Sequence, residues 1–164
     1  MNSMAAQRNL LRRARQRGNE VIEFTLCLFP ILGFLFMTID VAWMVFTRAT
    51  LQNAVQQGMR FAVVSRGNYA SPTAHKTAIK DSVKWWSRNM LRDKDDLIKV
   101  EWYSPDDLST PLPLVNSDGS PSSANAAGNV VKVSVENFIA APLLGIFHDL
   151  TPWAFRARSS DRMW

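Results

Sequence analysis

Cysteine is nearly absent from this sequence, and its scarcity excludes one class of small domain. The single cysteine, Cys27, lies inside a long apolar run, so the chain cannot form an intramolecular disulfide. We expect Cys27 to act as a small hydrophobic side chain. A fold held together by disulfides is therefore excluded, whereas an oxidising compartment is not.

Acidic residues are missing from the first 19 positions, where every basic residue is an arginine. These arginines are Arg8, Arg12, Arg13, Arg15 and Arg17. Without them the formal net charge of the chain falls from +5 to zero. The basicity belongs to an N-terminal arm and not to a folded surface, so we expect no nucleic-acid partner. An arginine-rich arm directly before an apolar run typically sets the orientation of a membrane helix.

Residue combinations that carry catalysis or hold metals are also missing. The chain has two histidines, and no motif places a nucleophile beside His148. His75 has no cysteine or second histidine nearby, and Asp106, Asp107 and Asp118 lack the spacing of a calcium loop. We therefore expect that the protein is not an enzyme and that it holds no metal or other cofactor.

The apolar run from Phe24 to Phe46 contains one charge, Asp40. At about 23 residues, the run is long enough to cross a bilayer with some tilt. Trp43 near its outer end suits a membrane interface. The arginines favour a cytoplasmic N-terminus and an extracytoplasmic C-terminus. The run is too long for an ordinary secretory signal, and no clear cleavage site of that type follows it.

Two acidic residues in this region need an explanation. For Asp40 two accounts stay open: its carboxylate reaches the outer interface, or it makes a polar contact with a neighbouring helix. Glu23 stands at the inner edge, where a carboxylate is costly unless a cation is close. Cleavage after Gly18 would create an α-amino group on Asn19, one helical turn from Glu23. The amine of a neighbouring subunit could pair with Glu23 in the same way.

The residues around the apolar run carry a family resemblance. They are Arg17-Gly18, Val21-Ile22-Glu23-Phe24, Pro30, Leu51-Gln52-Asn53-Ala54 and Gly58-Met59-Arg60. The spacing from Gly18 to Phe24 resembles the leader site of type IVb prepilins. The stretch from Arg17 to Val63 resembles the TadE-like pseudopilins of tight-adherence (Flp) pili.

The resemblance implies a minor pilin, or pseudopilin, that serves pilus assembly or surface adhesion. A prepilin peptidase would cleave between Gly18 and Asn19, and Glu23 would be the charge used in assembly. The helix motif would comprise Phe24, Pro30, Ala54, Gly58 and Arg60. The implied partners are that peptidase, other pilin subunits and the assembly platform, and the implied location is the bacterial inner membrane. The alternative is a single-pass anchor with an extracytoplasmic binding or sensory domain, which needs no processing.

The implied domains are a cleaved leader at 1–18, an N-terminal helix at 19–66 and an extracytoplasmic α+β domain at 67–164. Periodicity predicts that the first helix extends to about Val64 and that Gly67 helps to stop it. A helical stripe lies on its outer half: Leu51, Ala54, Gly58, Phe61 and Ser65. The small residues in this stripe permit close packing, which we interpret as ordinary core packing.

A second helix is predicted from Pro72 to about Leu91, with Ser71 as its cap. It carries a basic line with two tryptophans interleaved: Lys76, Lys80, Lys84, Trp85, Trp86 and Arg88. These residues could touch anionic headgroups or nucleic acid. The simpler interpretation is a solvated face with an aromatic contact to the core.

Alternation of apolar and polar residues predicts three strands, at 98–102, 131–136 and 153–158, in an antiparallel sheet. The predicted fold class is therefore α+β, and the family resemblance implies an arrangement like that of type IV pilins. The connection at 104–129 is long for a hairpin loop, so we expect it to be functional or disordered. An apolar patch at 142–147 is interpreted as a flap over the core or an exposed contact surface.

Overall fold

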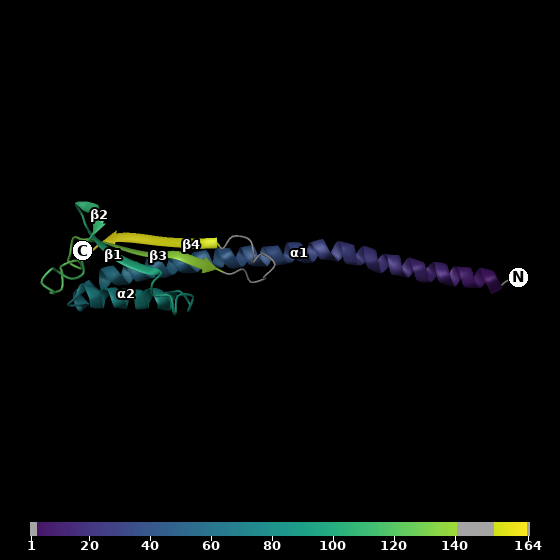
Figure 1. Cartoon of the computed structure of the whole chain (residues 1–164), viewed down its shortest axis with the longest axis horizontal. Helices are drawn as coiled ribbons and strands as arrows, with labels where there is room; N and C mark the ends of the chain where they lie inside the picture. The colour runs from purple at the N-terminus through teal and green to yellow at the C-terminus, as the bar shows by residue number, and fades with distance from the viewer. Residues whose placement is uncertain (1–2, 141–152, 164) are drawn as a thin grey trace. The chain divides into compact units, whose positions relative to one another are not determined.

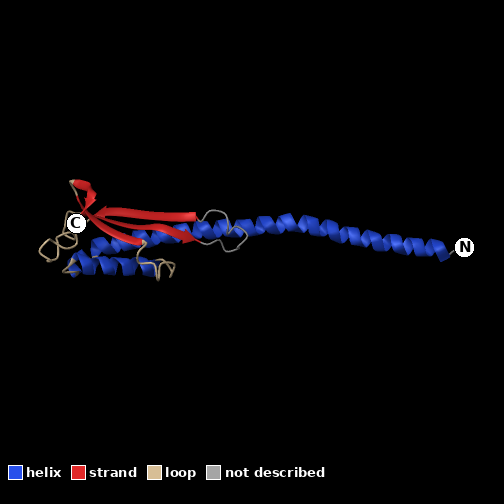
Figure 2. Cartoon of the chain, in the orientation of Figure 1, coloured by secondary structure: helices blue, strands red, loops and turns tan. Residues whose placement is uncertain are grey.

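The computed structural model describes residues 3–140 and 153–163, with side chains described from Glu20 to Ala140 and from Ala154 to Met163. The chain forms two compact units, Met1–Ala42 and Trp43–Trp164. Helix α1 (Ser3–Val64) begins in the first unit and continues into the second. The second unit adds a second helix and a sheet (Figures 1 and 2). The predicted apolar patch at 142–147 and His148 lie outside the described residues.

Helix α1 ends at Val64, as predicted, but begins at Ser3, well upstream of the predicted start at residue 19. The arginine-rich arm is helical because it consists largely of Arg, Ala, Leu and Gln, which are good helix formers. Pro30 lies inside the helix without interrupting it. A proline has no N–H for the carbonyl of Leu26, so this one bond is lost while the helix continues.

The end of α1 differs from the predicted glycine stop. A short 3-10 turn, η1 (Arg66–Asn68), follows the helix. The hydroxyl of Ser65 donates a hydrogen bond to the carbonyl of Phe61 at 2.6 Å. Among the described glycines only Gly119 and Gly128 have a positive φ, so Gly67 is not a left-handed cap. The helix ends by tightening its last turn.

Helix α2 (Pro72–Trp86) begins as predicted and ends earlier than Leu91. The side chain of Ser71 accepts a hydrogen bond from the backbone N–H of Ala74 at 3.2 Å, and Pro72 occupies the first turn. At the other end, Arg88 and Asn89 have φ values of 52° and 67°. Left-handed backbone cannot continue a right-handed helix, so α2 stops before these residues.

The sheet is antiparallel and has the strand order β2-β1-β3-β4. Its strands are β1 (Ile98–Ser104), β2 (Asp107–Pro111), β3 (Val130–Ala140) and β4 (Trp153–Arg162). The α+β class is therefore confirmed, but the structure has four strands where three were predicted. The additional strand, β2, is exposed along its whole length. It has no buried face, and therefore no alternation of apolar residues that could reveal it.

The register of β1 and β3 confirms the predicted buried face of the sheet. Val131 and Val133 pair with Trp102 and Val100, and all four side chains are buried. A bulge between Val135 and Phe138 then shifts the register of β3 against β4. The buried face packs on α1 through residues that include Leu51, Val55, Met59 and Ala62.

The opposite face of the sheet holds one residue that was predicted to be wet but is buried. Ser134 lies in register with Lys99 on β1 and with Arg158 on β4. Both of these long side chains reach Glu136, at 2.7 Å and 3.5 Å. Ser134 is buried because its neighbours pair around it, not because it belongs to the core.

Candidate functional site

All eight residues predicted to form the site lie on helix α1. Gly18, Asn19, Glu23, Phe24 and Pro30 lie in the first unit, whereas Ala54, Gly58 and Arg60 lie in the second. The predicted motif therefore falls into two parts with different surroundings.

The first part belongs to an apolar and exposed helical segment. Within α1, the stretch Glu20–Val64 is long and apolar enough to cross a membrane, with a mean hydropathy of 2.1 in its best window. Phe24, Phe29 and Phe34 are 66%, 78% and 74% exposed. Exposure of several such side chains to water is unfavourable by roughly 25 cal/mol per Å² of apolar surface. Lipid or the apolar surface of another helix is a more favourable surrounding for this segment.

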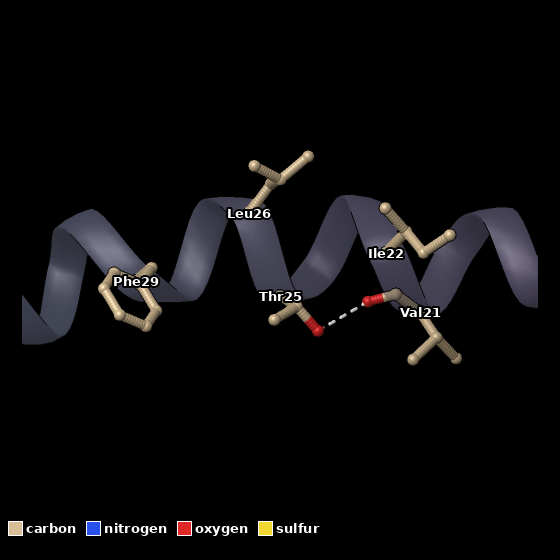
Figure 3. A pocket seen from close by; sticks show the side chains of 5 residues that line it. All are labelled: Val21, Ile22, Thr25, Leu26 and Phe29. Carbon is tan, nitrogen blue, oxygen red and sulfur yellow. Dashed lines mark hydrogen bonds between the residues drawn. The ribbon is translucent and has the colours of Figure 1, made fainter.

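One face of this segment forms a shallow apolar depression (Figure 3). It is lined by Val21, Ile22, Thr25, Leu26 and Phe29. The hydroxyl of Thr25 donates a hydrogen bond to the carbonyl of Val21 at 2.8 Å, so its polar group is satisfied within the helix. This face was not predicted as a site, although the helical spacing of its residues marks it. It suits an apolar partner because it presents no unsatisfied polar side chain.

Glu23 is exposed on the same segment and lies one turn after Asn19 in the helix. No side chain between Glu20 and Ala140 forms an ion pair with its carboxylate. Helical spacing places an amine on Asn19 within reach of this carboxylate, as the sequence predicts. The chain described here still carries the residues before Asn19, so this pairing stays a prediction.

Asp40 is only 3% exposed. The sequence left two accounts of Asp40 open. Burial does not fit the account in which its carboxylate reaches interfacial water. Thr47, two turns further along α1, is also buried, at 2% exposure. Two buried polar side chains therefore lie at and just beyond the outer end of the apolar run.

The second part of the predicted motif belongs to the core of the second unit. Ala54 is fully buried, and Gly58 is buried where α1 meets α2. A Cβ atom built on Gly58 would overlap Cγ2 of Val83 and would lie 3.8 Å from the carbonyl oxygen of Ile79. This confirms that these small residues permit close packing. Arg60 is exposed on another face of the helix.

A buried histidine next to this packing was not predicted. His75 is fully buried, and its ring stacks on Tyr69 with centroids 5.1 Å apart. Its Nε2 lies 3.2 Å from Oγ of Ser65. Because the Ser65 hydroxyl donates its hydrogen to the carbonyl of Phe61, its oxygen accepts a hydrogen bond from Nε2–H of His75. The four-residue spacing of His75 and Ile79 on one face of α2 was the signal that could have revealed this burial.

Burial lowers the pKa of His75 below 6.5, and a backbone hydrogen bond at Ala62 opposes the shift in part. Desolvation disfavours the charged imidazolium, so the neutral ring is the stable form in this core. No described serine, cysteine or carboxylate completes a catalytic set with this ring. His75 is a packed core residue with an unusual polar contact.

The outer face of the sheet carries ion pairs. Hydrogen bonding to Lys99 is the main cause that lowers the pKa of Glu136. Burial raises the pKa of Glu101, but hydrogen bonds from Tyr103 and Lys132 outweigh it and the pKa is lowered. Across residues 20–140 and 154–163, no group of three or more His, Cys, Asp or Glu side chains could hold a metal ion.

Comparison with known proteins links the first part of the motif to a family. Residues 18–60 match the model of the TadE-like protein family. No curated protein and no solved structure matches the chain. The match covers about a quarter of the chain and runs from Gly18 to Arg60, the first and last residues of the predicted site. It confirms the predicted resemblance: the stretch at 18–60 is TadE-like, which points to a Tad pilus-related protein with an N-terminal helix able to span a membrane.

Proposed function

We propose that the chain is a minor pilin, or pseudopilin, of a tight-adherence type IVb pilus. The observation that carries this proposal is the TadE-like match, which begins at Gly18. That residue lies after the arginine-rich arm and before the apolar part of α1. In this function α1 spans the inner membrane, with the arm in the cytoplasm and the second unit on the extracytoplasmic side. This orientation follows because positive charge stays on the cytoplasmic side.

Processing by a prepilin peptidase removes the arm by cutting between Gly18 and Asn19. Gly18 is the only glycine in α1 before Glu20, and no proline lies there. Glycine costs about 1 kcal/mol relative to alanine in a helix, so this is where the arm unwinds most easily. The missing side chain also allows the protease to approach the backbone closely.

Assembly uses Glu23 and the apolar face of α1. A carboxylate within the membrane costs on the order of 3 kcal/mol, and an ammonium partner offsets much of this cost. Cleavage supplies that ammonium as the new amine on Asn19, in the same subunit or in its neighbour. The exposed face around Leu26 and Phe29 provides helix contacts that replace lipid when the subunit leaves the bilayer. The second unit then contacts the other subunits or the assembly platform.

The size of the protein in cells with and without a prepilin peptidase tests this function. We expect the full chain to lose its first 18 residues only when the peptidase is present, and Gly18→Ala to prevent this loss. Gly33→Ala is the matched control, because nothing lies within 4 Å of a Cβ atom built on Gly33. A single-pass anchor with a binding or sensory domain would keep its full length in both cells. That result would contradict the proposal.

A further inference from the structure

A groove between the two helices of the second unit has no role in the function proposed above. Its walls are Phe46, Ala49, Thr50 and Asn53 on α1, and Trp85, Trp86 and Arg88 at the end of α2. Its volume is about 530 Å³. The helices run antiparallel here, because Gly58 meets Val83 whereas Ser65, later in α1, meets His75, earlier in α2. The end of α2 therefore lies beside the beginning of the α1 segment in this unit.

The aromatic side chains of this groove are exposed. Trp85 is 79% exposed, Trp86 is 45% exposed and Phe46 is 43% exposed. Trp102, in contrast, is fully buried in the core of the same unit. The sequence predicted an aromatic contact with the core here, but both tryptophans are exposed at the end of α2. Adjacent exposed aromatic residues that line one depression indicate a surface that has an occupant.

The position of the groove along α1 identifies that occupant. Phe46 is the last residue of the apolar run, so the groove begins where the predicted span ends. The α1 wall from Phe46 to Asn53 rises about 10 Å at 1.5 Å per residue. The headgroup layer on one side of a bilayer is about 5–8 Å thick. The groove therefore covers the depth of that layer.

The chemistry of the walls fits the same layer. Tryptophan is enriched at membrane interfaces because its ring is apolar while its indole N–H donates a hydrogen bond. Arg88 is exposed beside the two tryptophans and can donate to phosphate oxygens. Its φ of 52° is uncommon for a residue with a side chain, and the turn that contains it ends α2 at this point. Apolar rings and a cation thus stand together at the depth where acyl chains meet headgroups.

We propose that this groove seats a phospholipid of the membrane that α1 crosses, with Trp85 and Trp86 at the base of the headgroup layer and Arg88 at its phosphate. The bound lipid holds the second unit against the membrane. The proposal depends on insertion of α1, which belongs to the proposed function. It is independent of leader cleavage and of pilus assembly.

Fluorescence of the full chain in phosphatidylcholine vesicles tests the proposal, with bromine atoms placed on the acyl chains near the headgroup as quenchers. The variants Trp85→Phe and Trp86→Phe keep an aromatic ring and remove one emitter each. The difference from the unaltered chain therefore reports the emission of that tryptophan. We expect most of this emission to be lost in brominated vesicles relative to ordinary ones. The emission removed by Trp102→Phe, the buried control, should be the same in both.

Quenching of Trp43 by bromine and quenching by aqueous iodide keep the outcomes distinct. The emission removed by Trp43→Phe reports insertion of α1, and its loss in brominated vesicles is required. If Trp43 is not quenched, α1 is not inserted, and this proposal and the membrane location of the proposed function both fail. Failure of cleavage leaves all of these results unchanged.

If Trp43 is quenched by bromine while Trp85 and Trp86 are quenched by aqueous iodide instead, the groove faces water and the lipid proposal is overturned. If they are shielded from iodide only at high protein-to-lipid ratio and are not quenched by bromine, the occupant is a second copy of the chain. That outcome also overturns the lipid proposal.

Discussion

Gly58 on α1 and Val83 on α2 approach so closely that no side chain fits between the two helices. A Cβ atom on Gly58 would overlap Cγ2 of Val83 and would lie 3.6 Å from its Cβ atom. Both residues are buried. This contact sets the distance between the helices and therefore also the walls of the groove further along them.

Gly58→Ala should therefore destabilise the second unit although alanine is the better helix former. Overpacking of a core costs about 1–3 kcal/mol. The gain in helix propensity from glycine to alanine is at most about 1 kcal/mol, so the cost should outweigh it. Chemical denaturation of the full chain in detergent micelles measures the free energy of unfolding.

Two controls separate this clash from other effects of the substitution. Gly67→Ala has open space around the added Cβ atom and should change the stability little. In the double variant Gly58→Ala/Val83→Ala the clash is relieved, so the two losses should not add. Strictly additive losses would show that the helices do not meet through this contact.

The buried His75 predicts a dependence of stability on pH. Because burial lowers its pKa, the unfolded chain binds a proton at a higher pH than the folded chain does. The stability from the neutral ring is therefore complete above about pH 6.5 and is lost as the pH falls through the lower pKa of the folded state. The free energy of unfolding should fall by at most about 1.4 kcal/mol per pH unit in this range.

His75→Gln cannot titrate in this range and should remove the slope that sets in below about pH 6.5, whatever it does to stability at neutral pH. Glu101 and Glu136 also stabilise the fold, because their pKa values are lowered. They stay ionised until the pH falls below the ordinary range of a glutamate, so their effect is lost at a lower pH than that at which the His75 slope begins. Denaturation at several pH values measures the slope for each variant. An unchanged slope in His75→Gln would mean that another group causes it.

The role proposed for Glu23 predicts that leader cleavage and incorporation into filaments can be separated. Glu23→Ala removes the carboxylate but leaves Gly18 and Asn19 in place, so the leader should still be cut. The altered subunit should join filaments poorly, because the new amine lacks its partner in an apolar surrounding. Immunoblots of cell membranes and of sheared filaments measure the two steps.

Glu23→Asp is the matched variant, since it keeps the charge on a shorter side chain. It should assemble better than Glu23→Ala if charge pairing is the cause. Normal incorporation of Glu23→Ala would contradict the pairing role.

The sequence predicted the helices and strands in which buried apolar residues recur at a regular spacing. The stripe that contains Leu51 and Ala54 and the alternating valines of β3 were recognised because one face of each element is buried. Strand β2 was missed because neither of its faces is buried. Ser134 was misplaced because cross-strand neighbours cover it, and strand pairing is not visible in the local pattern.

The ends of the helices were harder to predict than their faces. The cap formed by Ser71 and Pro72 is a local signal, and the structure confirms it. The early end of α2 depends on the left-handed backbone of Arg88 and Asn89, for which Arg88 gives no sequence signal. For the site, the family resemblance located Gly18 to Arg60, but the lining of the groove by Trp85 and Phe46 needed the folded second unit.

The N-terminal residue of the mature protein tests the central claim most directly. The protein should be purified from a membrane that contains a prepilin peptidase, and its first residues determined by N-terminal sequencing or by mass spectrometry of the terminal peptide. We predict that the mature chain begins at Asn19, with Glu23 as its fifth residue. A chain that still begins at Met1, or that is cut at an unrelated position, would contradict the account.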